Sequence, residues 1–208
     1  MVEEFFLVQS RYSAAIKEIQ TKLEILDDEF QMRHRRNPIH HMQSRLKTIQ
    51  SMLEKLKRKN YEVSINSAVK NLQDIAGIRV ICSYVQDVYT IANLLVSQDD
   101  VHLVRMADYI REPKPNGYRS LHLIVEIPVF LSEGRILVPV EVQIRTIAMD
   151  FWASLEHSLR YKAQEYIPQH ISDELQRVAT DIASLDQRMQ AIHDQVDELS
   201  DARSDNAT

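Results

Sequence analysis

The sequence contains a single cysteine and no long hydrophobic run. Cys82 has no second cysteine to pair with, which excludes an internal disulfide framework and is typical of a reducing compartment. The apolar runs are far shorter than the roughly 20 residues that a membrane-spanning helix needs. The first residues, Met-Val-Glu-Glu, lack the basic start of a signal peptide. These absences predict a soluble, cytoplasmic protein without membrane contact.

Positive charge is also in the minority. The formal net charge of the 208 residues is −5, so the chain as a whole does not attract nucleic acid or anionic membranes. Any binding of phosphate must therefore come from local clusters of lysine and arginine. Glycine and proline are scarce as well, so each of them marks a place where a bend or loop is required. The remaining composition is that of one well-buried domain with additional helices.

Both ends of the chain read as long amphipathic helices. At the N-terminal end, apolar residues recur in steps of three and four: Phe5, Val8, Tyr12, Ile16, Ile19, Leu23, Leu26 and Phe30. At the C-terminal end, the repeat is regular enough to resemble a coiled-coil seam: Leu175, Val178, Ile182, Leu185, Met189, Ile192, Val196 and Leu199. Two arrangements explain this seam, which are packing against the N-terminal helix and an interface between subunits of a homo-oligomer.

The centre of the chain predicts a mixed sheet covered by helices, in an α/β or α+β arrangement. Five segments rich in valine, isoleucine and leucine are expected as strands: Ser44–Lys47, Ile78–Ser83, Val101–Met106, Leu121–Ile127 and Ile136–Arg145. Helical patterns cover Thr48–Lys59, Tyr84–Val96 and Ile147–Lys162. We therefore expect an N-terminal helix over 1–36, a central domain over 37–165, and a C-terminal helix with a short disordered tail over 166–208.

A basic helix follows the first predicted strand. Ser51, Lys55 and Arg58 fall on one face of it, and seven residues of helix rise about 10 Å, close to the length of an extended triphosphate. Arg45 and Lys47 are two residues apart on the strand and point the same way. Such an array of fixed donors suits phosphate oxygens. The alternative is a solvated basic surface.

Two carboxylates stand beside predicted strands. Asp74 opens the segment Asp-Ile-Ala-Gly-Ile-Arg that ends at Arg79, and Glu141 lies with Gln143 on the polar face of the last strand. If they meet, Asp74 and Glu141 form a site for a divalent cation, and Mg²⁺ suits oxygen ligands together with a triphosphate. The alternatives are that Asp74 caps a turn and pairs with Arg79, and that the polar face meets water.

The segment from Tyr109 to His122 reads as a loop, because it contains two prolines and Asn-Gly but no apolar periodicity. It is crowded with groups that bind nucleotides: Lys114, Arg119, His122 and the rings of Tyr109 and Tyr118. A tyrosine on such a loop can stack on a base. The alternative is an ordinary surface turn. The other histidines show no spacing typical of a zinc site.

Six motifs, read in this order, resemble the synthetase domain of the RelA/SpoT alarmone family. They are Arg45-x-Lys47, Ser51-x-x-x-Lys55-x-x-Arg58, Asp74-Ile-Ala-Gly-Ile-Arg79, Tyr109-Ile-x-x-Pro-Lys114-x-Asn-Gly-Tyr118-Arg-Ser-Leu-His122, Glu141-Val-Gln143-Ile-Arg145-Thr and Met149-Asp-Phe-Trp-Ala-Ser-Leu-Glu156-His157. The resemblance runs from about Asn37 to Lys162, and the helical flanks are similar to those of single-domain small alarmone synthetases. The loop is closer to the RelP type than to the RelQ type.

The resemblance implies a five-stranded mixed sheet related to nucleotidyltransferases and a Mg²⁺-dependent GTP pyrophosphokinase. Such an enzyme transfers pyrophosphate from ATP to the 3′-hydroxyl of GDP or GTP and makes the stringent-response alarmones ppGpp and pppGpp. The family also implies a homotetramer.

The resemblance assigns roles residue by residue. Arg45 and Arg79 would sandwich adenine, and the ATP phosphates would be held by Lys47, Ser51, Lys55 and Arg58. Asp74 would bind Mg²⁺, with Glu141 as second ligand or general base. Tyr118 would stack on guanine, and the acceptor would be surrounded by Lys114, Asn116, His122, Gln143 and Glu156.

Two positions depart from the family pattern. Ala107 stands where many relatives have a basic residue, which Arg105 or Arg111 would replace, and Asp150 stands where some have asparagine. Two other functions compete with the synthetase. One is an RNA-binding module that uses the basic residues 33–36, which the negative net charge does not favour and which would gain nothing from Asp74 and Glu141. The other is a nucleotidyltransferase with a different acceptor.

Overall fold

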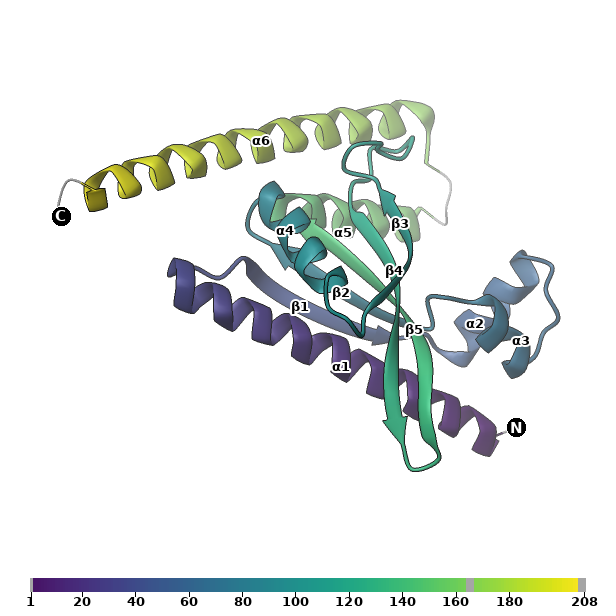
Figure 1. The fold of residues 1–208 in the computed structure, drawn as a ribbon. Coiled ribbons are helices and arrows are strands. Elements are labelled where there is room, and N and C mark those ends of the chain that lie inside the picture. Colours follow the sequence, from purple (N-terminus) through teal and green to yellow (C-terminus); the bar gives the residue numbers. More distant parts are fainter. Residues whose placement is uncertain (1, 164–166, 206–208) are drawn as a thin grey trace.

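The computed structural model describes residues 2–163 and 167–205, with side chains from residue 6 to residue 199 outside the gap. A five-stranded sheet lies at its centre in the spatial order β1-β2-β5-β4-β3 (Figure 1). Its strands are β1 (Ile39–Leu46), β2 (Ala76–Cys82), β3 (His102–Asp108), β4 (Leu121–Leu131) and β5 (Gly134–Thr146). Only β2 and β5 pair in parallel, and the other pairs are antiparallel. The predicted mixed sheet of five strands is confirmed.

The strand bounds differ from the prediction mainly at β1. This strand begins at Ile39, five residues before the predicted Ser44. Its first half contains the exposed residues His40 and His41 on an edge strand, so it carries no apolar alternation by which a sequence could reveal it. The predicted hairpin of the last two strands is present, and its turn passes through Gly134, where φ is +119°.

One face of the sheet is apolar and buried. Alternate residues of the central strands point to it, and the register places Ile78 beside Val142 and Val80 beside Ile144. Cys82, at the end of β2, is also fully buried on this face. Two helices cover the face, α1 (Val2–His34) and α4 (Val85–Val96).

The predicted apolar stripe of the N-terminal helix is the surface by which α1 meets the sheet. Six of its members are buried there: Val8, Tyr12, Ile16, Ile19, Leu23 and Leu26. Phe30 is half-buried at the end of the helix, and the side chain of Phe5 lies outside the described residues. The sheet therefore takes up the apolar stripe of α1.

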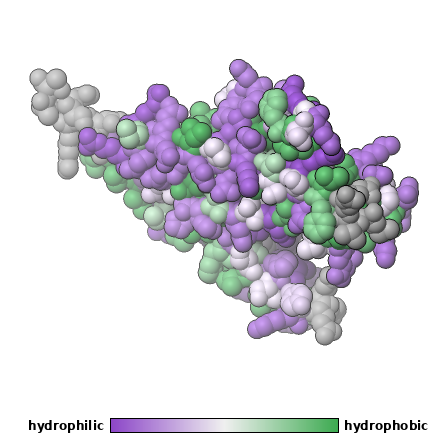
Figure 2. Space-filling model, turned by 90° about the horizontal axis from the view of Figure 1, so that it is seen from below, coloured by the Kyte–Doolittle hydropathy of each residue, from purple (hydrophilic) through white to green (hydrophobic). Residues whose placement is uncertain are grey.

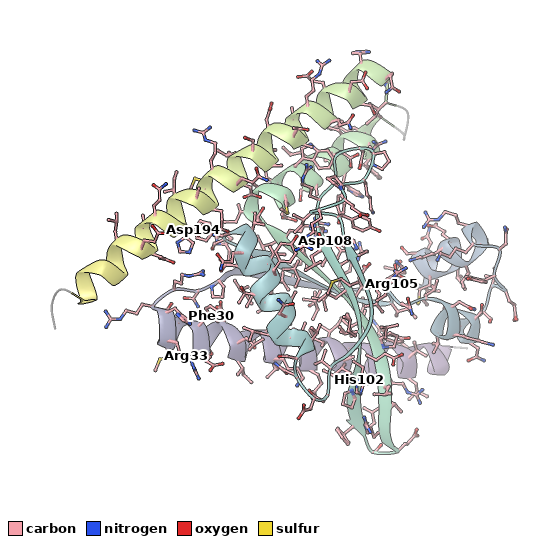
Figure 3. The ribbon with its side chains drawn as sticks, turned by 45° about the horizontal axis from the view of Figure 1, so that its top comes forward. Phe30, Arg33, His102, Arg105, Asp108 and Asp194 are labelled. Atoms are coloured by element: carbon pink, nitrogen blue, oxygen red, sulfur yellow. The ribbon has the colours of Figure 1, made fainter. Side chains whose placement is uncertain are left out.

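The C-terminal helix lies on the opposite side of the molecule. α5 (Ile147–Lys162) follows β5 directly, and α6 (Gln169–Asp205) packs against α5 and α4. Figures 1 and 3 show α1 and α6 on opposite sides of the sheet, with Phe30 and Arg33 on the one and Asp194 on the other. Packing of the C-terminal seam against the N-terminal helix is therefore wrong as an explanation, because the sheet already covers α1.

The end of α6 also differs from the prediction. The helix continues to Asp205, so most of the segment expected as a disordered tail is helical. Residues 206–208 lie outside the described part of the chain. Between residues 167 and 205 the C-terminal segment is thus one helix of 37 residues, beginning at Gln169.

Two short helices connect β1 to β2. α2 (Ile49–Arg58) was predicted, and Thr48 caps it by accepting a hydrogen bond from the backbone N–H of Ser51. α3 (Ile65–Asn71) was not predicted, because seven residues are too few to show a periodicity. Ser64 caps this helix in the same way.

The face that carries α1 is a mixture of hydrophilic and hydrophobic residues (Figure 2). Among the described residues, no helix combines the length and the apolar character that crossing a membrane requires.

Candidate active site

The other face of the sheet is polar and contains a hollow of about 330 Å³. Strand register creates it, because Gly77 lies beside Glu141 and Arg79 beside Gln143 on neighbouring parallel strands. We call this feature the polar hollow. Its lining consists of Gln43, Ser44, Arg45, Asp74, Gly77, Ile78, Arg79, Glu141 and Gln143. The two carboxylates predicted to meet thus line the same hollow.

Asp74 lies just before β2 and is held by two lysines. Its Oδ2 atom is 2.7 Å from Nζ of Lys47 and 2.5 Å from Nζ of Lys55. Burial raises the pKa of Asp74, but the hydrogen bonds from Lys47 and Lys55 outweigh that effect, so its pKa lies below the ordinary value. The other oxygen, Oδ1, is buried and accepts no hydrogen bond from any described residue.

Glu141 is held by side chains of β4 and β5. Its Oε2 accepts a hydrogen bond of 2.9 Å from Nε2 of Gln143, and its Oε1 is 3.5 Å from Nδ1 of His122. Burial raises the pKa of Glu141, but the contacts with His122 and Gln143 lower it further than burial raises it. The negative charge of Asp74 is near enough to oppose that lowering. Both carboxylates are therefore ionised at neutral pH, and their negative charges are close enough to repel each other.

The residues at the polar hollow fit a divalent cation. Two carboxylates face it, and the unpartnered Oδ1 of Asp74 is a buried acceptor that a cation would satisfy. In the described part of the chain, histidine, cysteine, aspartate and glutamate form no cluster of three or more that could hold a metal. A site with two protein carboxylates, completed by phosphate oxygens and water, is typical of Mg²⁺.

A second cluster surrounds Tyr118, beside the polar hollow. The Tyr118 hydroxyl is 2.9 Å from Nε2 of His122, and the Tyr109 ring meets the His122 ring edge-on at 5.1 Å. The Nζ atom of Lys114 lies over both tyrosine rings, 4.5 Å from the centroid of Tyr109 and 4.7 Å from that of Tyr118. Aromatic faces with a cation between them suit a nucleobase that carries phosphates.

The loop between β3 and β4 is anchored to α5. Asn116 donates a hydrogen bond of 3.0 Å from Nδ2 to Oε1 of Glu156, which also accepts from Arg160. The Oδ1 atom of Asn116 accepts from the backbone N–H of Tyr118 at 3.2 Å. The structure therefore brings Asn116, Tyr118 and Glu156 together, as the motif order suggested.

Arg145 belongs to one of the six motifs, but no role was predicted for it. It is 3% exposed and lies on the polar face of β5. Its guanidinium donates to Oε1 of Gln143, to the hydroxyl of Tyr118 and to Oδ1 of Asp150. A cation buried so deeply needs such partners. Its signal in the sequence was its place on the polar face of the last strand, two residues after Gln143.

Asp150 joins Arg145 to the other side of the polar hollow. Its Oδ1 atom is 3.1 Å from Nη1 of Arg145 and 3.3 Å from Nη1 of Arg79. Burial and the charge of Arg145 lower the pKa of Arg79, and Asp150 opposes this. Asp150 is thus an anion between two arginines.

Some predicted site residues are not brought to the polar hollow. Ser51 is exposed in the first turn of α2, where its Oγ accepts from Oγ1 of Thr48 at 3.0 Å. Arg58 is exposed in the last turn of the same helix. Ser51 precedes Lys55 by one turn of α2, and Arg58 follows it by about one turn.

Arg105 and Arg111 are the two candidates to replace the basic residue expected at the position of Ala107. Ala107 pairs with His122 across β3 and β4. Arg105, labelled in Figure 3, lies on β3 and is exposed. The Nε atom of Arg111 is 3.4 Å from Oδ2 of Asp108. A replacement of the missing basic residue by Arg105 or Arg111 stays a prediction.

Comparisons with known proteins agree with the motifs. The family model described as "Region found in RelA / SpoT proteins" matches residues 44–166. GTP pyrophosphokinase YwaC of Bacillus subtilis is 45% identical over 186 residues, 89% of this chain and 89% of the relative. GTP pyrophosphokinase YjbM of the same organism is 38% identical over 201 residues, 97% of this chain and 93% of its own. The crystal structure of small alarmone synthetase 1 from Bacillus subtilis, bound to its product pppGpp, is similar with a TM-score of 0.83 and 38% identity, over 93% of this chain and 97% of that chain.

Replacing Asp74 with asparagine is expected to lower the free energy of unfolding at neutral pH, because Lys47 and Lys55 lose their shared counter-charge. The pKa of Asp74 is depressed in the fold, so its contribution is present above the unfolded value of 3.8 and is lost as the pH falls through the folded value. Urea unfolding from about pH 7 to about pH 3 should therefore show a difference from wild type that shrinks as the pH falls.

The matched control is Asp28→Asn, at an exposed position of α1. It should leave the free energy of unfolding within about 0.5 kcal/mol of wild type at each pH. A difference for Asp74→Asn that does not change with pH would contradict the role given to its charge.

Proposed function

The chain belongs to the RelA/SpoT family, and we propose that it is a (p)ppGpp synthetase, which transfers pyrophosphate from ATP to the 3′-hydroxyl of GDP or GTP. The observation that carries the proposal is the meeting of Asp74 and Glu141 at one hollow with Arg45 and Arg79. Relatives that match almost the whole chain are named GTP pyrophosphokinases. A cytoplasmic location and a RelP-type loop belong to the same proposal.

The reaction forms one bond and breaks another. The 3′-hydroxyl oxygen of the acceptor bonds to the β-phosphorus of ATP, and the bond from that phosphorus to the oxygen shared with the α-phosphate breaks. AMP leaves, and the proton of the hydroxyl needs an acceptor. Glu141 is the proposed proton acceptor, because it lines the polar hollow and also contacts His122 in the cluster around Tyr118.

The low pKa of Glu141 limits how it can act. A carboxylate with a depressed pKa is always charged at neutral pH but is a weak base. That property suits a residue that orients the hydroxyl and helps to hold a cation, in addition to receiving the proton late in the transfer. The contact with His122 supports the orienting role of Glu141, because His122 also contacts Tyr118, on which the acceptor nucleotide would stack.

The ATP side is proposed on β1, α2 and β2. Arg45 and Arg79 would hold adenine between them, and the phosphates would be bound by Lys47, Ser51, Lys55 and Arg58. Lys47 and Lys55 support this part of the proposal because they are already fixed beside Asp74. Two ammonium groups on one carboxylate oxygen are a concentration of positive charge that suits a triphosphate.

Magnesium is the proposed cofactor, held by Asp74 and Glu141. When bound, it supplies Lewis-acid activation of the phosphoryl groups and offsets their charge. The unpartnered Oδ1 of Asp74 supports its place at this carboxylate.

The acceptor side is proposed around Tyr118, whose ring would stack on guanine. Its neighbours in the proposed acceptor site are Lys114, Asn116, His122, Gln143 and Glu156. The cations and rings of this cluster support a guanine nucleotide, since the Nζ atom of Lys114 lies over the rings of Tyr109 and Tyr118 and brings positive charge to the place where the base would stack.

The direct test is incubation with Mg²⁺, labelled ATP and each guanine nucleotide, with products separated by charge. Wild type should convert label into ppGpp or pppGpp. Asp74→Asn and Glu141→Gln should each reduce turnover by about 100-fold or more, because they remove a ligand or proton acceptor while keeping the side-chain shape. Asp28→Asn serves as the control with unchanged turnover. Normal product formation by the Glu141 variant would remove that residue from the mechanism.

Replacing Tyr118 separates the two nucleotide sites. Tyr118→Ala should weaken binding of GDP or GTP by about 1–3 kcal/mol through loss of stacking, with little effect on binding of an ATP analogue. Tyr118→Phe keeps the ring and loses only the hydroxyl that contacts His122 and Arg145, so it should bind the acceptor more tightly than the alanine variant. Calorimetric titration measures both. Equal losses for both nucleotides would place Tyr118 outside the acceptor site.

A homotetramer is proposed through the C-terminal seam. Two members of the seam, Leu175 and Ile182, turn inward to pack with Trp152, and the others are 38% to 62% exposed: Val178, Leu185, Met189, Ile192, Val196 and Leu199. A regular apolar stripe of this length on one helix is typical of a subunit interface.

The double variant Leu185→Glu with Ile192→Glu should reduce the molar mass in solution, because like charges would meet across the seam. Light scattering after gel filtration measures it. Phe130→Glu, at a residue that is 74% exposed on the β4–β5 hairpin, is the control and should leave the mass unchanged. An unchanged mass for the double variant would exclude the seam as the interface.

A further inference from the structure

The loop that carries Tyr118 packs against helix α6 through Gly117. Gly117 has a φ of +89°, which favours glycine, and its N–H donates to the carbonyl of Lys114 at 2.8 Å to close a tight turn. A Cβ atom on Gly117 would lie 2.5 Å from the Cβ of Ala179 and 3.6 Å from the Cα of Gln176. Ala179 is buried. Gly117 therefore has no room for a side chain.

The helix is fastened on both sides of this contact. One turn before Ala179, the carbonyl of Leu175 accepts a hydrogen bond of 3.0 Å from Nε1 of Trp152. Two turns after it, Oδ2 of Asp186 accepts one of 2.5 Å from Oγ1 of Thr146, which also caps α5. α6 therefore cannot slide or rotate at Ala179 without breaking one of these bonds.

The same helix also limits the ring of Tyr118. This ring packs on a small apolar cluster formed by Trp152, Ala153 and Ala179. One side of the ring is thus set by α5 and α6, and the hydroxyl is set by His122 on β4. Backbone and ring of the loop are both fixed by contacts with residues of other elements.

We propose that Ala179 is a positioning residue for the guanine nucleotide, through which α6 holds the loop from Lys114 to Tyr118 in its binding shape before substrate arrives. This inference rests on the proposed function of Tyr118. A loop that is ordered in advance costs less conformational entropy when it binds, so the support raises acceptor affinity. In this role α6 acts through the loop.

The support acts on one substrate only. The residues proposed for ATP, such as Arg45 and Lys55, lie on β1 and α2, whereas α6 packs against α5 and α4. Displacing α6 at Ala179 should therefore raise KM for the guanine nucleotide and leave KM for ATP unchanged. A residue with a merely structural role would change both together.

The test compares Ala179→Leu with Ala191→Leu, the same substitution at an exposed position of the same helix. We expect KM for GDP or GTP to rise about tenfold in the first variant, within the range that loss of a stacking contact causes, and to stay at the wild-type value in the second. The fluorescence of Trp152, the only tryptophan of the chain, shows whether α6 stays docked. Equal KM values in the two variants, or a parallel rise for both substrates, would overturn the inference.

Hydrogen–deuterium exchange tests the support without any nucleotide. Peptides that cover residues 113–120 should exchange faster in Ala179→Leu than in wild type or Ala191→Leu, and unchanged exchange would overturn the inference. If wild type makes no (p)ppGpp, the proposed function fails, while this measurement still decides whether α6 holds the loop. If the leucine variant does not fold, Ala179→Gly replaces it, because a gap behind Gly117 should also speed exchange.

Discussion

The carboxylate of Asp74, shared by two lysine ammonium groups, is the interaction on which the polar hollow depends. Lys47 follows the last residue of β1, Lys55 lies on α2, and Asp74 lies just before β2. One carboxylate therefore connects three elements of the fold. Without it, two like charges would face each other in a partly buried place. The second oxygen of the same carboxylate, Oδ1, is buried without a hydrogen-bond partner among the described residues, so it remains an acceptor that a cation would satisfy.

Periodicity along the sequence predicted much of the fold and part of the site. Alternation on the last strand placed Glu141 and Gln143 on one face, and the structure has them there, because one buried face and one polar face leave no freedom of register. The contact of Arg145 with Asp150 could not be predicted, since it crosses the junction between β5 and α5, where neither strand nor helix spacing applies. The surface that packs against the C-terminal seam could not be predicted either, because an apolar stripe on a helix is the same whether it packs within the chain or against another subunit.

A chain of polar contacts links the two proposed nucleotide sites. Arg79 on one side and Tyr118 on the other are connected through Asp150 and Arg145 without a break. The basic segment at the end of α1 has no comparable connection, since Arg36 is bound to the buried Asp87 and Arg33 to Glu29. These pairs weaken the case for RNA binding by that segment.

The chain carries a single thiol, and the sheet encloses it. Cys82 has no exposed surface, and burial, reinforced by the charge of Asp87, raises the pKa of its thiol well above the ordinary value. Oxidants and alkylating reagents attack the thiolate, which is thus neither formed nor reachable while β2 stays between its neighbours. The native protein therefore offers no reactive thiol to its surroundings, and its one sulfhydryl becomes reactive only when the sheet opens.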